Sequence, residues 1–165
     1  MCRKESEIFI RNIDKKDLDV LYVIDQKCFT PEIAYDRTFF KQLLSHSSMT
    51  GFMLEIKTGT AGTGTSRANS TDPAGFILAV RHRNLAEIVT IDILKPYRRR
   101  GFGQILMQKA EENLSSYNVT QVCLHVSVGN KPAINLYQKL DYFVLCEEKN
   151  YYQNNEDAYT MFKLL

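Results

Sequence analysis

Residues 87–107 join an apolar strand, a basic turn and an amphipathic helix, and this stretch constrains the fold more than any other. Residues 87–94 are rich in β-branched side chains, which predicts a strand. From about Gly101 to Ser115 the apolar residues recur at helical spacing, at Phe102, Ile105, Leu106, Ala110 and Leu114. The turn between the strand and the helix, residues 98–103, therefore lies at a helix N-terminus.

This turn reads R-x-x-G-x-G and is predicted to bind a phosphate group. A helix N-terminus presents unpaired backbone N–H groups and the positive end of the helix dipole. Glycine lets the backbone approach a phosphate closely, and Arg98, Arg99 and Arg100 add positive charge. No lysine follows Gly103, which excludes a Walker loop, and the third glycine of a dinucleotide fingerprint is missing. Taken alone, the turn could equally be a solvated arginine run at the start of an ordinary helix.

The composition is that of one globular domain. The chain has 165 residues, of which 44% are apolar and 24% charged, and this excludes wholesale disorder. A net charge of +2 is too small to indicate a nucleic-acid or membrane partner. The four cysteines form no C-x-x-C pair, which is typical of reduced thiols in a cytosolic protein. Because no apolar stretch suits a signal peptide or a membrane helix, we expect a cytoplasmic protein with a single domain over residues 1–165.

The rest of the chain alternates predicted strands and helices around this central stretch. Strands are predicted at residues 8–10, 52–56, 74–80, 121–128, 142–146 and 158–164. One helix is predicted to follow an N-cap at Asp14, a second to begin at Asp36, and a third to follow an N-cap at Asn130. The order β-α-α-β-β-β-α-β-α-β-β predicts a mixed α/β sheet in one layer with helices on its faces.

Residues 58–72 consist almost entirely of Gly, Thr, Ser, Ala and Asn and have little apolar surface to bury. They are predicted to form a flexible hairpin loop between the strands at 52–56 and 74–80. This loop is either a tolerated insertion or a lid over a functional site.

The order of elements, the R-x-x-G-x-G turn and the N-x-x-A-x-x-L-Y segment from Asn130 to Tyr137 together resemble the GNAT superfamily of N-acetyltransferases. Residues 150–152 and 156–158 further resemble the ending of the protein N-terminal acetyltransferases, which include the RimI-type enzymes and their archaeal and eukaryotic relatives. The resemblance covers roughly residues 8–164. It implies the GNAT fold, a mixed, mostly antiparallel central sheet with two splayed parallel strands and helices on both faces.

One departure from the family pattern concerns the end of the last helix. The family usually has L-G-F there, whereas this chain reads Leu140, Asp141, Tyr142. Aspartate tolerates a left-handed helix C-cap less well than glycine does, so the departure puts local stability in doubt and not the chemistry.

The resemblance implies acetyl-CoA as the cosubstrate and no metal. The backbone of Ile91, Asp92 and Ile93 would bond the pantetheine arm as a strand would. The turn would hold the pyrophosphate, and Asn130 and Tyr137 would contact the coenzyme from the other side. The turn residues in this set are Arg98, Arg99, Arg100, Gly101, Phe102, Gly103 and Gln104.

Acetyl transfer to an amine also needs a base for the amine proton and an acid for the leaving thiolate. The resemblance gives the base position to Glu87 and His125 and the acid to Tyr137. The alternatives are an exposed edge glutamate, a satisfied core histidine and a core aromatic. On its strand His125 shares a face with Cys123 and Ser127, which leaves room for a water molecule beside it.

The resemblance implies that the acceptor is the N-terminal α-amine of proteins. Ribosomal proteins and an auxiliary subunit are among the partners it implies. Two segments would grip the first residues of the acceptor, and their candidate residues are Phe29, Glu32, Tyr35, Tyr151 and Tyr152. Each of these tyrosines could equally be a surface aromatic.

Other functions remain open at this point. The acceptor could be a lysine side chain, a small amine or a polyamine, and the domain could bind acetyl-CoA without catalysis. An RNA-binding role for Lys95 and the three arginines ranks last, because no aromatic residues are interleaved with that basic cluster.

Overall fold

A mixed sheet of seven strands organises residues 7–57 and 71–165, the residues that the computed structural model describes. The strand order is β1-β2-β3-β4-β5-β7-β6, and every neighbouring pair is antiparallel except β4 and β5. The elements are β1 (Ile8–Asn12), η1 (Lys15–Asp17), α1 (Leu18–Cys28), α2 (Arg37–Ser45), β2 (Met49–Lys57), β3 (Thr71–His82), β4 (Leu85–Ile93), η2 (Lys95–Tyr97), α3 (Phe102–Ser116), β5 (Gln121–Ser127), α4 (Lys131–Lys139), β6 (Phe143–Glu148) and β7 (Ala158–Leu164).

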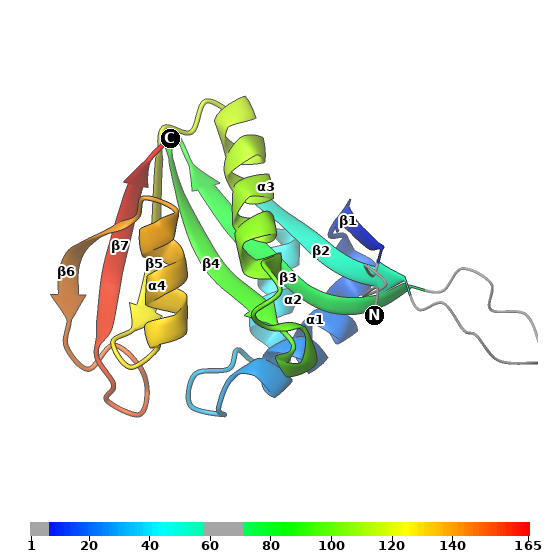
Figure 1. The fold of residues 1–165 in the computed structure, drawn as a ribbon, viewed down its shortest axis with the longest axis horizontal. Coiled ribbons are helices and arrows are strands. Elements are labelled where there is room, and N and C mark those ends of the chain that lie inside the picture. The colour runs from blue at the N-terminus through cyan, green and yellow to red at the C-terminus, as the bar shows by residue number, and fades with distance from the viewer. Residues whose placement is uncertain (1–6, 58–70) are drawn as a thin grey trace, which may run out of the picture.

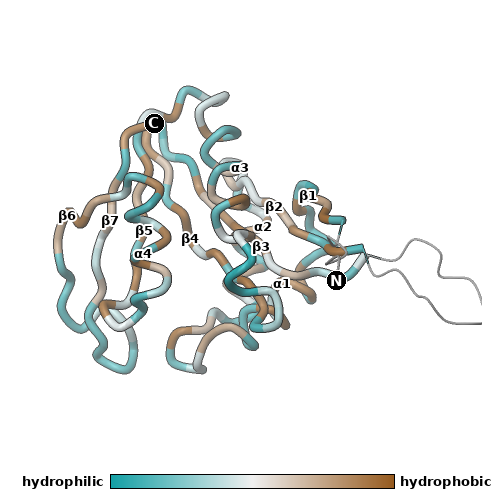
Figure 2. The backbone as a smooth tube through the Cα atoms, viewed as in Figure 1, coloured by the Kyte–Doolittle hydropathy of each residue, from teal (hydrophilic) through white to brown (hydrophobic). Residues whose placement is uncertain are grey.

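Helices cover both faces of the sheet, and a separate apolar core lies on each face. In Figure 1, α3 and α4 lie in front of the sheet, and α1 and α2 lie behind it. Leu106, Met107 and Leu124 belong to the core under α3 and α4, whereas Leu21, Phe40 and Phe76 belong to the core under α1 and α2. Hydrophobic segments follow the strands in Figure 2, and the loop between β6 and β7 is largely hydrophilic. Among the described helices, none is both long and apolar enough to span a membrane.

The predicted order of elements and the predicted fold class are confirmed. The central strand, turn and helix are β4, residues 94–101 and α3, and all five residues assigned to the apolar face of α3 are buried or pack against the core. The prediction for Asp14 is wrong in detail. Asp14 caps the 3-10 turn η1 through a hydrogen bond from the Lys16 N–H, and the α-helix starts only at Leu18.

The hairpin segment at residues 58–72 lies mostly outside the described residues. For its last two residues the loop prediction is wrong, because Thr71 and Asp72 are the first residues of β3. They pair with Lys57 and Ile56 of β2, and the Thr71 hydroxyl donates a hydrogen bond to Glu55. Because of these cross-strand contacts, β3 begins before the apolar residues 74–80 that predicted it.

The strand predicted at residues 142–146 is shifted towards the C-terminus and runs over Phe143–Glu148. Tyr142 is excluded from it because its side chain is buried beneath α3, where its hydroxyl donates to Glu111 Oε1 at 2.9 Å. β6 is an edge strand, and all its residues are exposed.

Asp141 follows α4 with a φ of 67°, the left-handed conformation that its place in the sequence predicts. Asp141→Gly is expected to raise the free energy of unfolding by about 1 kcal/mol, because glycine reaches this φ without the steric cost of a Cβ atom. Urea denaturation measures the change. Asn118→Gly is the matched control, since Asn118 follows α3 with a φ of 61° and asparagine accepts this conformation more readily. A gain at Asp141 no larger than the gain at Asn118 would contradict the prediction.

Candidate active site

Strands β4 and β5 lie side by side at their amino ends and then separate, which opens the sheet into a V (Figure 1). Their parallel ladder joins Leu85–Ile88 only to Gln121–Leu124. Beyond this point residues 90–93 remain paired with β3 on their other side. Their second backbone edge therefore faces the opening, where an extended molecule can pair with it as an added strand would.

The turn predicted to bind phosphate follows β4 directly and starts α3. Gly101 is the N-cap residue with a φ of 84°, and no side chain in the described part of the chain caps this helix. The Ile105 N–H donates to the Gly101 carbonyl, so the N–H groups of Phe102, Gly103 and Gln104 precede the helical ladder. These three donors and the helix dipole make the turn suitable for an anion.

Gly103 lies next to the Leu136 side chain of α4. A Cβ atom at this position would stand 3.0 Å from Leu136 Cδ2, and a branched side chain would press further into α4. At Gly101 an added Cβ would meet nothing within 4 Å, so that glycine serves the positive φ and not close packing. The two glycines of the turn thus have different physical roles.

The three arginines of the turn are exposed, and Arg98 and Arg100 make different contacts. Arg98 turns back toward the sheet, and its Nε donates to the Ile93 carbonyl at 2.8 Å. Arg100 lies over the rings of Tyr97 and Phe102, at 6.0 and 5.9 Å from their centroids. The binding of a phosphate by Arg98, Arg99 and Arg100 stays a prediction.

His125 lies on β5 between two carboxylates. Its Nδ1 is 3.4 Å from Glu87 Oε1, and its Nε2 is 3.8 Å from Glu148 Oε1. Glu148 is in turn fixed by a 2.8 Å hydrogen bond from the Thr160 hydroxyl. The imidazole also stacks on the Tyr151 ring, with centroids 4.7 Å apart and planes inclined by 13°. The predicted strand faces are confirmed, because Leu124 and Val126 are buried while His125 remains partly accessible.

Tyr137 projects from α4 and is 6% exposed. Burial raises its pKa, and the neighbouring Tyr152 and Asp92 raise it further. Its hydroxyl therefore stays protonated at neutral pH and has a proton to donate. The Tyr137 ring itself packs in the core under α3 and α4, with its centroid 6.0 Å from that of Tyr142.

Three of the predicted acceptor-binding tyrosines belong to one group. Tyr35 lies between α1 and α2 in residues 29–36, the acceptor loop, which holds three of the predicted acceptor-binding residues. Its ring stacks on Phe39 with centroids 3.9 Å apart, and burial raises its pKa, with smaller contributions from Tyr151, Tyr152 and Glu87. The rings of Tyr151 and Tyr152 are 5.0 Å apart at an angle of 81°. Burial and the neighbouring Tyr151 raise the pKa of Tyr152 to about 12.

The remaining predicted residues lie outside this group of side chains. Phe29 is half-buried and Glu32 is exposed in the acceptor loop, and neither has a described contact with His125 or the tyrosines. Asn130 is the N-cap of α4, and its Oδ1 accepts the Ala133 N–H at 3.3 Å. Ile91 and Ile93 are half-buried along the opening, whereas the Asp92 side chain points into the core.

Glu148 and Asp25 belong to the surroundings of the site but were missed in the sequence. Glu148 reaches His125 because β6 pairs with β7 and β7 pairs with β5, a placement that no local pattern reveals. Asp25 is fully buried on α1. Its place next to Ile24, on the apolar side of the helix, was the one available signal.

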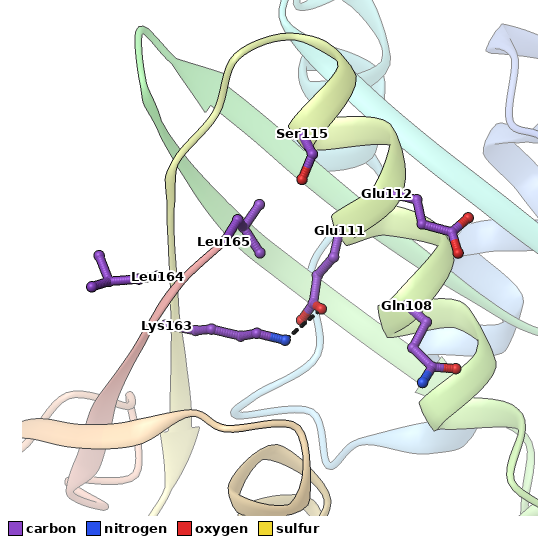
Figure 3. A pocket seen from close by; sticks show the side chains of 7 residues that line it. All are labelled: Gln108, Glu111, Glu112, Ser115, Lys163, Leu164 and Leu165. Carbon is purple, nitrogen blue, oxygen red and sulfur yellow. Dashed lines mark hydrogen bonds and ion pairs between the residues drawn. The ribbon is translucent and has the colours of Figure 1, made fainter.

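A surface pocket elsewhere on the molecule is lined by residues of α3 and the end of β7 (Figure 3). It contains the 2.6 Å ion pair between Lys163 Nζ and Glu111 Oε2. Its α3 residues lie from the middle of the helix to its C-terminal end, and Leu164 pairs with Gln121 at the amino end of β5, so the pocket lies away from residues 98–103 and from the wide end of the V. Among residues 7–57 and 71–165, no group of three or more His, Cys, Asp or Glu side chains is suited to bind a metal ion.

Comparison with known proteins agrees with this geometry. The model of the acetyltransferase (GNAT) family matches residues 18–142. An N-alpha-acetyltransferase from Sulfurisphaera tokodaii is 31% identical over 164 residues, which are 97% of this chain and 95% of that protein. The structure of a ribosomal-protein-S18-alanine N-acetyltransferase from Escherichia coli has a TM-score of 0.79 at 22% identity and covers 96% of this chain and 94% of its own. Arabidopsis thaliana NAA60 in complex with acetyl-CoA has a TM-score of 0.77 at 22% identity, with 96% and 99% covered.

Proposed function

Because this chain belongs to the acetyltransferase (GNAT) family, we propose that it transfers the acetyl group of acetyl-CoA to the N-terminal α-amine of proteins. The choice of acceptor rests on the 31% identity to an N-alpha-acetyltransferase along nearly the whole chain. The tyrosines at the wide end of the V supply a surface suited to the first residues of a peptide. In more detail, the proposal includes ribosomal proteins as acceptors and an auxiliary subunit as a partner.

The opening between β4 and β5 fits acetyl-CoA. The uncapped N–H groups at the start of α3 suit its pyrophosphate. The backbone edge of β4 beyond Ile88, which β5 leaves unpaired, suits the amides of its pantetheine arm, although the Ile93 carbonyl already accepts a bond from Arg98 Nε. The bound coenzyme supplies an activated acetyl thioester. The Tyr137 hydroxyl, kept protonated by burial, is the group that would return a proton to the departing sulfur.

The acceptor amine must lose its proton before it can attack. An α-amine with a pKa of about 8 needs less assistance than a lysine side chain with a pKa of about 10. We assign the removal of this proton to His125, directly or through water, with Glu87 orienting the imidazole from Nδ1 at 3.4 Å. Stacking on Tyr151 limits the rotation of the ring and holds its nitrogens toward the carboxylates on each side.

The acceptor assignment is tested by incubating the chain with acetyl-CoA and a panel of peptides that differ in their first residue. Fragmentation mass spectrometry then locates the acetyl group. The expected product carries it on the α-nitrogen, and the same peptides with a blocked N-terminus and an internal lysine stay unmodified. Acetylation of the blocked peptides or of spermidine alone would instead establish a lysine or polyamine acceptor. Coenzyme binding without transfer to any amine would establish a non-catalytic module.

A further inference from the structure

Two buried carboxyl groups meet behind the active site and have no role in the chemistry described above. Asp25 on α1 is 0% exposed, and Asp92 on β4 is 1% exposed. α1 packs against the face of the sheet opposite to α3 and α4 (Figure 1). The pair therefore joins the helix that precedes the acceptor loop to the strand that faces the coenzyme.

In each carboxyl group one oxygen accepts a hydrogen bond and, among the described residues, the other oxygen accepts none. Asp25 Oδ2 accepts the Tyr35 N–H at 2.9 Å, and Asp92 Oδ1 accepts the Thr90 hydroxyl at 2.6 Å. In the described part of the chain, Asp25 Oδ1 and Asp92 Oδ2 have no donor. Two bare carboxylates buried side by side would repel each other, whereas one proton between them removes a charge and satisfies both oxygens.

We propose that Asp25 and Asp92 share one proton, and that the hydrogen bond formed by this proton holds the acceptor loop against β4. In this role Asp25 and Asp92 are positioning residues that act through the loop. The part that concerns the acceptor rests on the proposed function, but the shared proton does not.

Burial raises the pKa of both carboxyl groups, that of Asp92 well above its usual range and that of Asp25 to about 6. One proton held between them removes a charge that burial disfavours. The other titratable or charged groups that face the pair are Cys28 on α1, Arg98 after β4, Tyr35 in the acceptor loop and Tyr137 on α4.

The Asp25–Asp92 pair is one of several contacts that link α1 to the acceptor loop and to β4. Gln26 Nε2 donates to the Tyr35 carbonyl at 3.0 Å, so both backbone groups of Tyr35 are bonded to side chains of α1. Cys28 Sγ lies 3.5 Å from the Ile93 carbonyl and links the end of α1 to β4. Through these contacts the position of Tyr35 depends on how α1 is held to β4.

The sign of the pH effect follows from the raised pKa values. The folded chain keeps a proton on this pair that the unfolded chain releases near an aspartate pKa of 3.8. Stability from the pair is therefore fully present below that value, declines as the pH rises above it, and is lost once the pH has risen through the raised folded pKa values.

The test compares Asp92→Asn with Asp92→Ala in the full chain. Asparagine keeps an N–H donor toward Asp25 Oδ1 and a carbonyl acceptor for Thr90, but it cannot titrate. Alanine removes the donor and leaves Asp25 Oδ1 unpaired. We expect the KM for an acceptor peptide to rise about tenfold in Asp92→Ala and to change less than about twofold in Asp92→Asn, as the loss of one buried hydrogen bond predicts.

Two further measurements do not depend on any acceptor. Infrared spectroscopy at pH 7.5 is expected to show the carbonyl band of a protonated carboxylic acid in the wild type and not in Asp92→Asn. Urea denaturation from pH 5 to 9 is expected to show a decline in stability that Asp92→Asn removes. The matched control is Asp17→Asn, because Asp17 is also buried but its pKa is lowered by Arg11. That variant should keep the infrared band and the decline.

Absence of the infrared band in the wild type would overturn the shared proton. Equal KM values in Asp92→Asn and Asp92→Ala would overturn the positioning role. If the wild type acetylated no peptide, the proposed function would fail while the infrared and denaturation results still decided the state of the pair.

Discussion

Gly103→Val is expected to weaken acetyl-CoA binding at least about 30-fold, which corresponds to about 2 kcal/mol and to the loss of charge-assisted hydrogen bonds. The phosphate groups must approach the first N–H groups of α3, and a branched side chain at this position obstructs that approach. Isothermal titration calorimetry measures the dissociation constant, and circular dichroism establishes that the variant is folded. Unchanged affinity in a folded variant would contradict the assignment of residues 98–103 as the site that binds the phosphate groups of acetyl-CoA.

The structure adds a second cause that must be separated from the first. A Cβ atom at residue 103 would stand 3.0 Å from Leu136 Cδ2, so valine would also press on the Leu136 side chain of α4. The double variant Gly103→Val/Leu136→Ala relieves that contact. If the loss of affinity comes from the phosphate turn, the double variant stays as weak as Gly103→Val. Recovery of affinity would show that packing between the two helices, and not access to the backbone donors, was the cause.

His125→Ala and Glu87→Gln are each expected to lower turnover about 10- to 100-fold, the usual range for a general acid or base. His125 Nδ1 and Glu87 Oε1 are 3.4 Å apart, so the two groups can serve one proton transfer. The double variant should therefore lose less than the product of the two single effects. Steady-state kinetics with an N-terminal peptide at saturating acetyl-CoA measure all three variants. A fully multiplicative loss would show that the two residues act independently.

The pH–rate profile distinguishes the base from its neighbour. With His125 as the base, the acidic limb should move or flatten in His125→Ala and persist in Glu87→Gln. If the limb persists in the histidine variant and vanishes in the glutamate variant, Glu87 is the base. Glu148→Gln is a useful companion, because Glu148 approaches the other nitrogen of the same imidazole at 3.8 Å.

Much of the fold follows from local patterns in the sequence. The apolar periodicity of residues 102–114 predicts the face of α3 that the core buries. The alternation along residues 122–126 predicts which side chains of β5 point inward, and His125 is not among them. The left-handed conformation of Asp141 follows from its place after a helix. These features depend on backbone geometry over a few residues, which is why the sequence alone contains them.

The composition of the site was decided only by the tertiary structure. Glu87, His125 and Glu148 come together because β4, β5, β7 and β6 pair in an order that differs from their order in the chain. The separation of β4 from β5 beyond Ile88 depends on packing across the whole sheet. Asp92 is predicted from the sequence only as part of the strand whose backbone would bond the pantetheine arm, and Asp25 lies within a predicted helix; only the packing of α1 on β4 makes them a buried pair. Contacts between residues far apart in the chain carry no local signature, because burial and the cost of unpaired charge arise only when the elements have packed.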